Sequence, residues 1–237
     1  MNIVITGTSK GIGFELARSF AKDDNNTVIA IARSENLLIE LKNACIRQDL
    51  RNKLRTIVFD LERIADIKTV LIPEITKHIK SVDILINNAG ILINKPFENF
   101  EINEIKQIFD INFISHSILI KELIPYLKSG NPKHVINISS MGGYQGSAKF
   151  SGLSYYSASK AALANLTECL AEELKDDGIK VNCLALGSVD TEMLQKAFPD
   201  YKASVKPFDM ANFIYEFAVN AHKFFNGKII PVNSTTP

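Results

Sequence analysis

Two hydrophobic patterns alternate along this chain. Short runs that are almost entirely apolar, rich in Ile and Val, are separated by longer stretches in which apolar residues recur at helical spacing. Continuous apolar runs of this kind are typical of strands covered on both faces, as in a parallel sheet. The predicted strands are Asn2–Thr6, Thr27–Ala32, Leu54–Phe59, Asp83–Ile86, His134–Ile138, Lys180–Ala185 and Lys228–Val232. The predicted helices cover residues 11–22, 34–48, 62–79, 101–128, 154–176 and 208–222.

The alternation of strands and helices predicts an α/β fold, with an open, doubly wound parallel sheet and helices on both faces. No linker, internal repeat or low-complexity tract interrupts it, so we expect one domain over residues 1–237. The composition, 46% hydrophobic and 22% charged, is ordinary for a globular protein with a large core.

The charge balance argues against two classes of partner. The chain has 27 Lys and Arg, 26 Asp and Glu, and a net charge of +1. Nucleic acids and anionic membranes bind through a basic excess, so we expect neither as a partner. No apolar run reaches the roughly 18–20 residues that a membrane span needs. Because Met1 leads directly into the strand-like run Asn2–Ile5, we expect no signal peptide and a cytoplasmic protein.

Cysteine and histidine residues show no disulfide or metal pattern. The three cysteines are odd in number and widely spaced, which favours reduced structural thiols. The four histidines lack metal-ligand spacing, so we expect no metal and assign them to surface or packing positions. These residues are Cys45, Cys169, Cys183, His78, His116, His134 and His222.

A glycine-rich turn, Thr6–Gly13, follows the first predicted strand and opens the first helix. Gly7 permits a tight turn, while Gly11 and Gly13 let the backbone and the helix approach a pyrophosphate closely. Unpaired amides at the helix N-terminus attract that anion. The spacing is G-x-x-x-G-x-G, and the Gly-Lys-Ser/Thr of a nucleoside triphosphate loop is missing. The context therefore favours a dinucleotide site over a glycine-rich turn without a ligand.

Tyr156 and Lys160 lie one turn apart in the predicted helix 154–176. Reducing a carbonyl requires a proton on the oxygen as hydride arrives at the carbon. A phenol with a pKa of about 10 is a reluctant acid at neutral pH. A nearby ammonium lowers the pKa of a phenol, so we expect Lys160 to activate Tyr156. Tyr155 lacks a lysine at this offset, so we expect it to pack at the pocket wall.

Five segments, taken in order, resemble the motif series of the short-chain dehydrogenase/reductase family. They are Thr6–Gly13, Asn87-Asn88-Ala89-Gly90, Asn112, Ser139-Ser140 and Tyr156-x-x-x-Lys160, and together they span nearly the whole chain. The resemblance implies a Rossmann-like three-layer sandwich with seven parallel strands that binds NAD(P). It also implies a Tyr/Lys/Ser/Asn active site beside the nicotinamide.

The resemblance assigns roles to four catalytic residues, Asn112, Ser140, Tyr156 and Lys160. It implies that Lys160 bonds the nicotinamide ribose and that Asn112 links this lysine to solvent through water. Ser140, at the end of a predicted strand, would polarise the substrate oxygen. Ser139 and Ser154 remain alternatives for the serine role. Asn87 resembles a structural residue that braces the sheet.

The end of the second strand predicts the cofactor. An acidic residue there would bond the ribose hydroxyls of NAD, but the chain has Arg33. Arg33 and Lys10 would bond a 2′-phosphate, so we expect NADP(H) to be preferred over NAD(H), unless both are solvated surface charges. Asp60 resembles the family residue that bonds adenine. The expected cofactor-binding residues are Gly7, Thr8, Ser9, Lys10, Gly11, Ile12, Gly13, Arg33, Ser34, Asp60, Leu61, Asn88, Ala89, Gly90, Tyr156, Lys160, Gly187, Val189 and Thr191.

Two segments depart from the family pattern. Ser140 and Tyr156 are farther apart than is usual, and the extra residues fall in Met141–Ser154 beside the substrate. We therefore expect an altered pocket shape with catalysis retained. The family's Pro-Gly after the sixth strand is Leu186-Gly187 here, which loosens the loop without removing a catalytic group.

The expected pocket wall is apolar and consists of Leu92, Ile93, Met141, Tyr144, Phe150, Leu153, Leu186, Met193 and Leu194. Such a wall favours a hydrophobic ketone or secondary alcohol over a sugar, although the same residues would also suit a core. The substrate loop near residues 187–208 is short, so we expect an open mouth. The run Glu168–Asp177 is acidic and would repel an acyl carrier protein, which argues against a ketoacyl-carrier-protein reductase.

The sequence therefore predicts an NADPH-dependent carbonyl reductase or alcohol dehydrogenase acting on a small molecule. The alternative is a regulatory or scaffold protein that binds the cofactor with little turnover, and a nucleic-acid binder ranks last. Helices 101–128 and 154–176 are the expected interface of a homodimer or homotetramer, because the second is rich in alanine and permits close packing.

Overall fold

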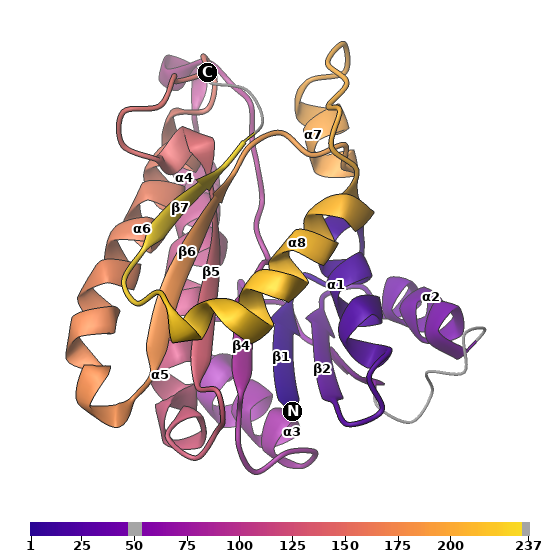
Figure 1. The fold of residues 1–237 in the computed structure, drawn as a ribbon. Helices are drawn as coiled ribbons and strands as arrows, with labels where there is room; N and C mark the ends of the chain where they lie inside the picture. Colours follow the sequence, from indigo (N-terminus) through magenta and orange to yellow (C-terminus); the bar gives the residue numbers. More distant parts are fainter. Residues whose placement is uncertain (47–53, 234–237) are drawn as a thin grey trace.

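The computed structural model describes residues 1–46 and 54–233. It has one sheet between two layers of helices (Figure 1). The strands are β1 (Asn2–Thr6), β2 (Thr27–Ala32), β3 (Leu54–Val58), β4 (Ile84–Asn87), β5 (His134–Ser140), β6 (Lys180–Leu186) and β7 (Ile229–Val232). They lie in the order β3-β2-β1-β4-β5-β6-β7, and all six pairings are parallel. The predicted Rossmann-like, doubly wound α/β fold is confirmed.

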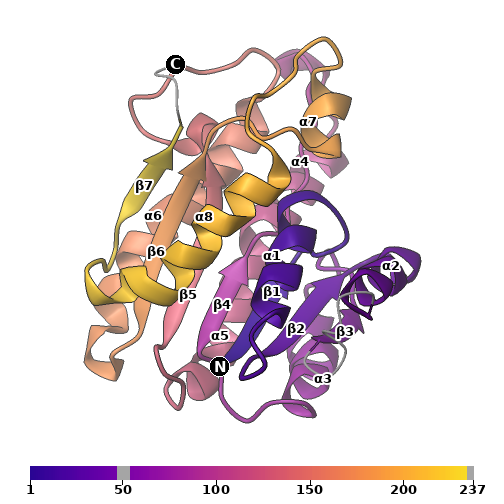
Figure 2. The same cartoon turned by 45° about the vertical axis from the view of Figure 1, so that its right-hand side comes forward.

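The helices are α1 (Gly11–Ala21), α2 (Glu35–Ile46), α3 (Ile72–Thr76), α4 (Ile102–Phe109), α5 (Ser115–Leu127), α6 (Ser154–Glu173), α7 (Glu192–Ala197) and α8 (Pro207–Asn220). Short 3-10 turns cover Phe97–Asn99, Met141–Gly143, Lys175–Asp177 and Ala221–Lys223. Helices α1, α2 and α8 cover one face of the sheet, and α3, α5 and α6 cover the other (Figures 1 and 2).

Hydrophobic side chains fill the space between each helical layer and the sheet. On one face Leu16 and Phe20 of α1 pack with Ile214 of α8 and the strands. On the other face Leu119 and Leu123 of α5 belong to a second buried cluster. Strands β1 to β6 each contribute to both clusters because alternate side chains point to opposite faces, whereas β7 packs against the first cluster. This explains why the strands read as continuous apolar runs.

Most predicted helices match the structure within a few residues. The last two residues of the predicted helix 34–48 lie outside the described residues. The predicted helix 62–79 is wrong over its first part, because turns occupy Glu62–Asp66 and helical structure starts with a π-helical segment at Ile67–Leu71 that continues into α3. Helix α7 was not predicted.

The predicted helix 101–128 is interrupted. A π-helical segment, Asp110–Ile114, separates α4 from α5, and the amide of Ser115 bonds the carbonyl of Asp110, five residues back. The wider turn contains Asn112. A helix that accommodates one extra residue in this way is commonly found at a functional site.

The strand order reverses between β1 and β4, which are neighbours although far apart in sequence. The crevice at the carboxyl ends of strands beside such a reversal is where ligands bind in open α/β sheets. Helix α7 lies beyond these same strand ends (Figure 2).

Candidate active site

A cavity of about 900 Å³ opens at the carboxyl ends of the strands. Every residue predicted to bind the cofactor lines it, except Thr8, and so do Ser140, Tyr156 and Lys160. Thr8 is buried instead, and its hydroxyl donates to the carbonyl of Ile31 at 3.2 Å. Segments separated by up to two hundred residues thus share one site.

The glycine-rich turn is packed too tightly for side chains. Gly7 has φ +72°, and a Cβ there would lie 2.7 Å from the Cα of Ala89. A Cβ on Gly13 would lie 2.2 Å from the carbonyl oxygen of Gly7. No side chain caps the N-terminus of α1 at Lys10, so the first amides of the helix are available to an anion. The turn therefore fits the pyrophosphate of a dinucleotide.

Asn88 supports this turn from the neighbouring strand. Its Nδ2 donates to the carbonyls of Thr6 at 3.0 Å and Gly7 at 3.2 Å. The hydroxyl of Thr6 accepts in return from the amides of Asn88 and Ala89, both at 3.0 Å. These bonds hold the two cofactor-facing loops at the reversal point in a fixed relation.

The cations predicted to select NADP(H) lie at the cavity wall with carboxylate partners. Arg33 lies 3.8 Å from Asp60, and its side chain is 68% exposed. Lys10 lies 2.5 Å from Glu192, at the start of α7. Both cations are positioned at the surface of the cavity, where they can exchange a carboxylate for a phosphate.

Tyr156 and Ser140 meet inside the cavity. The phenol hydroxyl is hydrogen-bonded to Ser140, whose Oγ also accepts from the amide of Gly142 at 3.2 Å. Burial raises the pKa of Tyr156, and the bond to Ser140 works against it. Lys160 was predicted to lower the pKa of Tyr156, but the pKa is raised because burial outweighs the hydrogen bond to Ser140. The hydroxyl is protonated at neutral pH.

Lys160 lies below this tyrosine. Its Nζ is 6.0 Å from the centre of the Tyr156 ring and donates to the carbonyl of Ile138 at 2.8 Å. The side chain is buried, and burial lowers the pKa of Lys160 to about 8. Cys183 opposes this shift, but burial raises the pKa of its own thiol to about 12. The ammonium is retained at neutral pH and lost a little above it.

Asn112 acts on the backbone rather than in the cavity. Its Oδ1 accepts from the amide of Ile91 at 2.8 Å, and its Nδ2 donates to the Ile91 carbonyl at 3.0 Å. The same Nδ2 donates to Ser159 at 3.0 Å. A Cβ on Gly90 would meet Asn112 Oδ1 at 3.2 Å and Lys160 Nζ at 3.3 Å. The π-helical segment therefore places Asn112 directly behind the lysine.

The alternative candidates have other positions. Ser139 is buried and donates to the carbonyl of Lys160 at 2.8 Å, so its hydroxyl supports α6. Ser154 is exposed at the start of α6 and does not line the cavity. Tyr155 packs between Phe97 and Phe100, with ring centres 5.3 and 5.0 Å apart, and is not among the cavity-lining residues. Geometry thus favours Ser140 and Tyr156.

The lengthened segment Met141–Ser154 is held by a lysine. The ammonium of Lys149 donates to the carbonyls of Gly142 at 3.0 Å and Tyr144 at 2.7 Å, and to the hydroxyl of Ser147 at 2.9 Å. Phe150 follows directly and lines the cavity. The extra residues thus form part of the substrate wall without moving Ser140 or Tyr156 apart.

The substrate end of the cavity is mainly apolar. Of the predicted wall residues, Ile93 and Tyr144 do not line it. Residues that the sequence did not single out do line it, and these include Ile91, Lys196, Phe198, Tyr201 and Asn233. The wall is broader than predicted and includes Lys196.

The segment after Gly187 is held by several contacts. Val189 pairs with Val205, and Asp190 binds Lys206 at 2.5 Å. Thr191 caps α7 by accepting from the amide of Leu194 at 3.3 Å. With the Lys10–Glu192 ion pair, these contacts connect α7 to the glycine turn, and the open mouth stays a prediction.

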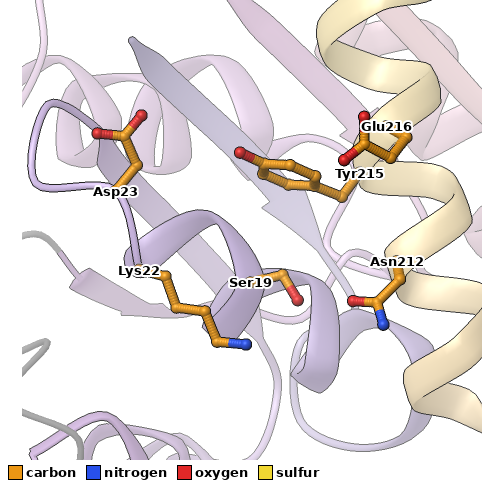
Figure 3. Close-up of a pocket in the computed structure, with 6 residues that line it drawn as sticks. All are labelled: Ser19, Lys22, Asp23, Asn212, Tyr215 and Glu216. Atoms are coloured by element: carbon orange, nitrogen blue, oxygen red, sulfur yellow. The ribbon is translucent and has the colours of Figure 1, made fainter.

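A second cavity, of about 360 Å³, lies between α1 and α8 (Figure 3). Ser19, Lys22 and Asp23 face Asn212, Tyr215 and Glu216 across it. Burial raises the pKa of Tyr215, and the carboxylates of Asp23 and Glu216 raise it further. Because burial and these carboxylates disfavour the ionised phenol, this cavity does not compete with the one containing Tyr156.

Within residues 1–46 and 54–233, no group of three or more His, Cys, Asp or Glu side chains is arranged to hold a metal ion. Over the same described residues, none of the helices has both the length and the apolar character needed to cross a bilayer.

Known proteins resemble this chain over most of its length. A family model described as short chain dehydrogenase matches residues 1–202. The ketoacyl reductase HetN of Nostoc sp. is 33% identical over 187 residues, covering 79% of this chain and 63% of HetN, so the chain spans less than two thirds of that relative. The uncharacterized oxidoreductase YxjF of Bacillus subtilis is 31% identical over 214 residues, covering 87% of this chain and 78% of YxjF.

Solved structures share the fold. A protein from Shigella flexneri assigned to the short chain dehydrogenases, solved with NADP, has a TM-score of 0.87 at 25% identity and covers 97% of this chain and 95% of its own. A 4-hydroxyisoleucine dehydrogenase solved with NADH has a TM-score of 0.83 at 25% identity, with 98% and 96% coverage. Either nicotinamide cofactor thus occurs among similar proteins.

Proposed function

This chain belongs to the short-chain dehydrogenase/reductase family and is an NAD(P)-dependent oxidoreductase. On that premise we propose that it interconverts a hydrophobic ketone and a secondary alcohol with NADP(H). The alternative, a regulatory or scaffold protein with the same fold and little turnover, is distinguished by the turnover experiment below. The observation that carries the proposal is the protonated Tyr156, bonded to Ser140 and next to Lys160 in the cavity that the glycine turn lines.

Tyr156 is the general acid in the direction of reduction. Because burial raises its pKa, the hydroxyl holds its proton at neutral pH and can donate it to a carbonyl oxygen. Ser140, bonded to the same hydroxyl, is placed to donate to that oxygen as well and to polarise the carbonyl. When bound, NADPH supplies the hydride to the carbonyl carbon.

Lys160 holds a positive charge behind the tyrosine. That charge stabilises the phenolate that remains after the proton leaves, since an opposite charge favours the ionised form. Asn112 and Ser159 brace the loop at Ile91 and the helix that carries the lysine. The catalytic residues in this proposal are therefore Asn112, Ser140, Tyr156 and Lys160, of which Asn112 positions the others.

The cofactor preference rests on charge. Arg33 and Lys10 lie at the cavity wall and are paired only with exposed or half-exposed carboxylates, which a phosphate can displace. A 2′-phosphate carries close to two negative charges and accepts bidentate bonds from a guanidinium. We therefore propose NADP(H) over NAD(H).

The substrate class rests on the cavity wall. Met141, Phe150, Leu153 and Leu186 line it beside Tyr156, and an apolar wall gains most from an apolar ligand. HetN is named a ketoacyl reductase. For this chain, the acidic end of α6 at Glu172 and Glu173 still argues against an acidic carrier protein.

The proposal extends to the assembly and location. Phe97 and Ile102, near the start of α4, are each 63% exposed, and exposed apolar groups often mark an interface. We expect a cytoplasmic homodimer or homotetramer assembled through residues 101–128 and 154–176. Sedimentation equilibrium of the wild type and of Ile102→Glu would test this, and a monomeric wild type would exclude it.

The deciding experiment compares Tyr156→Phe with Tyr155→Phe, a matched control on the adjacent residue. NADPH oxidation is followed optically against ketones, diketones, aldehydes and quinones, with NADH in parallel. The Tyr156 variant should bind NADPH and lose turnover by about 10²–10⁴-fold. The Tyr155 variant should retain it. Wild-type rates in Tyr156→Phe would reject the assignment.

A further inference from the structure

Glu192 connects the segment after β6 to the glycine turn. It is the first residue of α7, and its carboxylate accepts a hydrogen bond from the ammonium of Lys10 at 2.5 Å. The two residues are 182 positions apart in the sequence, and both line the cavity. Thr191 packs on the same turn, since a Cβ added to Gly11 would lie 3.3 Å from the Cγ2 of Thr191. The start of α7 is therefore held at the part of the cavity that fits the phosphates of a dinucleotide.

The carboxylate of Glu192 occupies a cation that the cofactor also uses. Lys10 is one of the two cations proposed to bond the 2′-phosphate of NADP(H). A lysine ammonium is a single compact charge, so Lys10 cannot bond fully to a phosphate while Glu192 holds it. The two side chains are 47% and 65% exposed, and an exposed ion pair is weak enough to exchange. A phosphate, with about two negative charges, is the stronger partner.

Helix α7 extends from this contact to the substrate end of the cavity. Its six residues span about 9 Å, and at its far end the carbonyl of Ala197 accepts from Asn94 Nδ2 at 2.8 Å. The amide of Lys95, the next residue, donates to the carbonyl of Gly152 at 3.0 Å, beside Leu153 of the substrate wall. One end of α7 is thus bonded to the cofactor side and the other to the substrate side. The α7 residues that line the cavity after Glu192 are Met193, Leu194 and Lys196.

We propose that Glu192 is a specificity-determining residue for the cofactor: it binds Lys10 when no 2′-phosphate is present, releases Lys10 to the 2′-phosphate of NADP(H), and keeps it when NAD(H) binds. The choice of cofactor then decides whether the start of α7 is bonded to the glycine turn. Because α7 forms part of the substrate wall, the same exchange links the cofactor to the substrate end. The inference rests on the proposed preference for NADP(H).

Replacement of Glu192 by glutamine should strengthen NADPH binding. The Glu192→Gln variant keeps the size of the side chain and removes its charge, so Lys10 no longer has to leave a carboxylate before it meets the phosphate. An exposed ion pair shifts such an equilibrium by up to about fivefold, so the Kd for NADPH should fall by about two- to fivefold. The Kd for NADH should stay unchanged. The measurement is titration with each cofactor by calorimetry or nicotinamide fluorescence.

A double-mutant cycle with Lys10→Ala separates exchange from a general effect of charge. Without the ammonium there is nothing for Glu192 to release, so Glu192→Gln should have no effect on the Kd for NADPH in the Lys10→Ala background. An equal gain in affinity in both backgrounds would overturn the inference, and so would an unchanged Kd for NADPH in Glu192→Gln alone.

Glu172→Gln is the matched control. Glu172 on α6 is 74% exposed, pairs with Lys175 and does not line the cavity. This variant changes the net charge of the protein by the same amount as Glu192→Gln. It should leave the Kd for either cofactor as in the wild type, and a gain in NADPH affinity equal to that of Glu192→Gln would contradict the assignment of Glu192.

Hydrogen exchange measures the link to α7. The amides of Leu194 and Gln195 bond to Thr191 at the start of the helix. In the wild type they should exchange up to about fivefold faster with NADPH bound than with NADH bound, because the ion pair that holds the first turn is released. In Glu192→Gln the two complexes should exchange alike. Equal exchange in the two wild-type complexes would overturn the link.

These measurements do not depend on turnover. If Tyr156→Phe keeps full activity, the catalytic assignment fails, whereas the cofactor titrations still decide the role of Glu192. If the wild type binds NADH as tightly as NADPH, the proposed cofactor preference fails, and the cycle between Lys10 and Glu192 still shows whether the carboxylate competes with the 2′-phosphate.

Discussion

Replacement of Arg33 by alanine should weaken NADPH binding and leave NADH binding unchanged. Arg33 is 68% exposed and lies 3.8 Å from Asp60. At that separation in water, Coulomb's law gives about 1 kcal/mol for a pair of unit charges. A 2′-phosphate carries nearly twice the charge of a carboxylate, so at a comparable separation it gains about 2 kcal/mol.

That energy corresponds to an increase of roughly 10- to 30-fold in the Kd for NADPH. NADH has no 2′-phosphate, so its Kd should change by less than about twofold. The assay is titration of the protein with each cofactor by calorimetry or nicotinamide fluorescence. Because the contact is exposed, the loss should shrink as the salt concentration rises.

Arg63→Ala is the control. Arg63 is also exposed, at 59%, pairs with Asp66 at 2.5 Å, and does not line the cavity. The Arg63→Ala variant should leave the affinities for NADPH and NADH unchanged. If Arg33→Ala weakens NADPH and NADH equally, the effect is on the site as a whole, and the assignment of Arg33 to the 2′-phosphate is wrong.

Three further predictions concern the catalytic lysine, the lengthened loop and acid stability. Because burial lowers the pKa of Lys160 to about 8, kcat should decline above that pH as the ammonium is lost, and Lys160→Arg should show no such decline. Lys149→Ala removes three hydrogen bonds from the segment Met141–Ser154 and should raise KM about tenfold with kcat nearly unchanged, whereas a fall in kcat alone would contradict a role in the substrate wall. Burial lowers the folded-state pKa of His134 from its ordinary value of 6.5 to about 4, so the unfolded chain binds the extra proton and stability falls as pH drops from 6.5 toward 4. By pH 5 the loss is about 2 kcal/mol, measured by urea unfolding, and His134→Gln should show a shallower decline.

The strands could be predicted because a strand covered on both faces buries nearly all of its side chains, which makes its sequence a continuous apolar run. All seven were placed within two residues of the observed ends. The predicted helix 62–79 failed over its first part, because Ile67, Leu71 and Ile75 are buried at helical spacing whereas the residues before them form turns. Hydrophobic periodicity shows which side chains are buried, but it does not show the backbone conformation of the segment.

The site could be predicted where the residues are close in sequence, because their spacing within one element then fixes their relative positions. Tyr156 and Lys160 share a helix, and the glycine turn joins one strand to one helix, so their relations are local. The contact between Lys10 and Glu192, which are 182 residues apart in the sequence, depends on the tertiary fold. The direction of the Tyr156 pKa was missed for the same reason, because desolvation is set by surrounding atoms that no motif contains.

His116 illustrates a different limit. A single histidine has no pattern, and its assignment to a surface or packing position was the natural expectation. Only the packed structure shows that the ring is fully buried.

The π-helical segment at Asp110–Ile114 makes the site sensitive to the deletion of a single residue. Such a segment is a regular helix with one residue too many, and the surplus is absorbed within a single turn. Deletion of one of its residues would let α4 and α5 join as an unbroken α-helix, with both helices still packed in place. The peptide at Asn112 would then return to the regular hydrogen-bond ladder and leave its position behind Lys160. A one-residue deletion here should therefore yield a folded but inactive protein, whereas the lengthened segment Met141–Ser154 holds its extra residues beside an intact Ser140–Tyr156 pair.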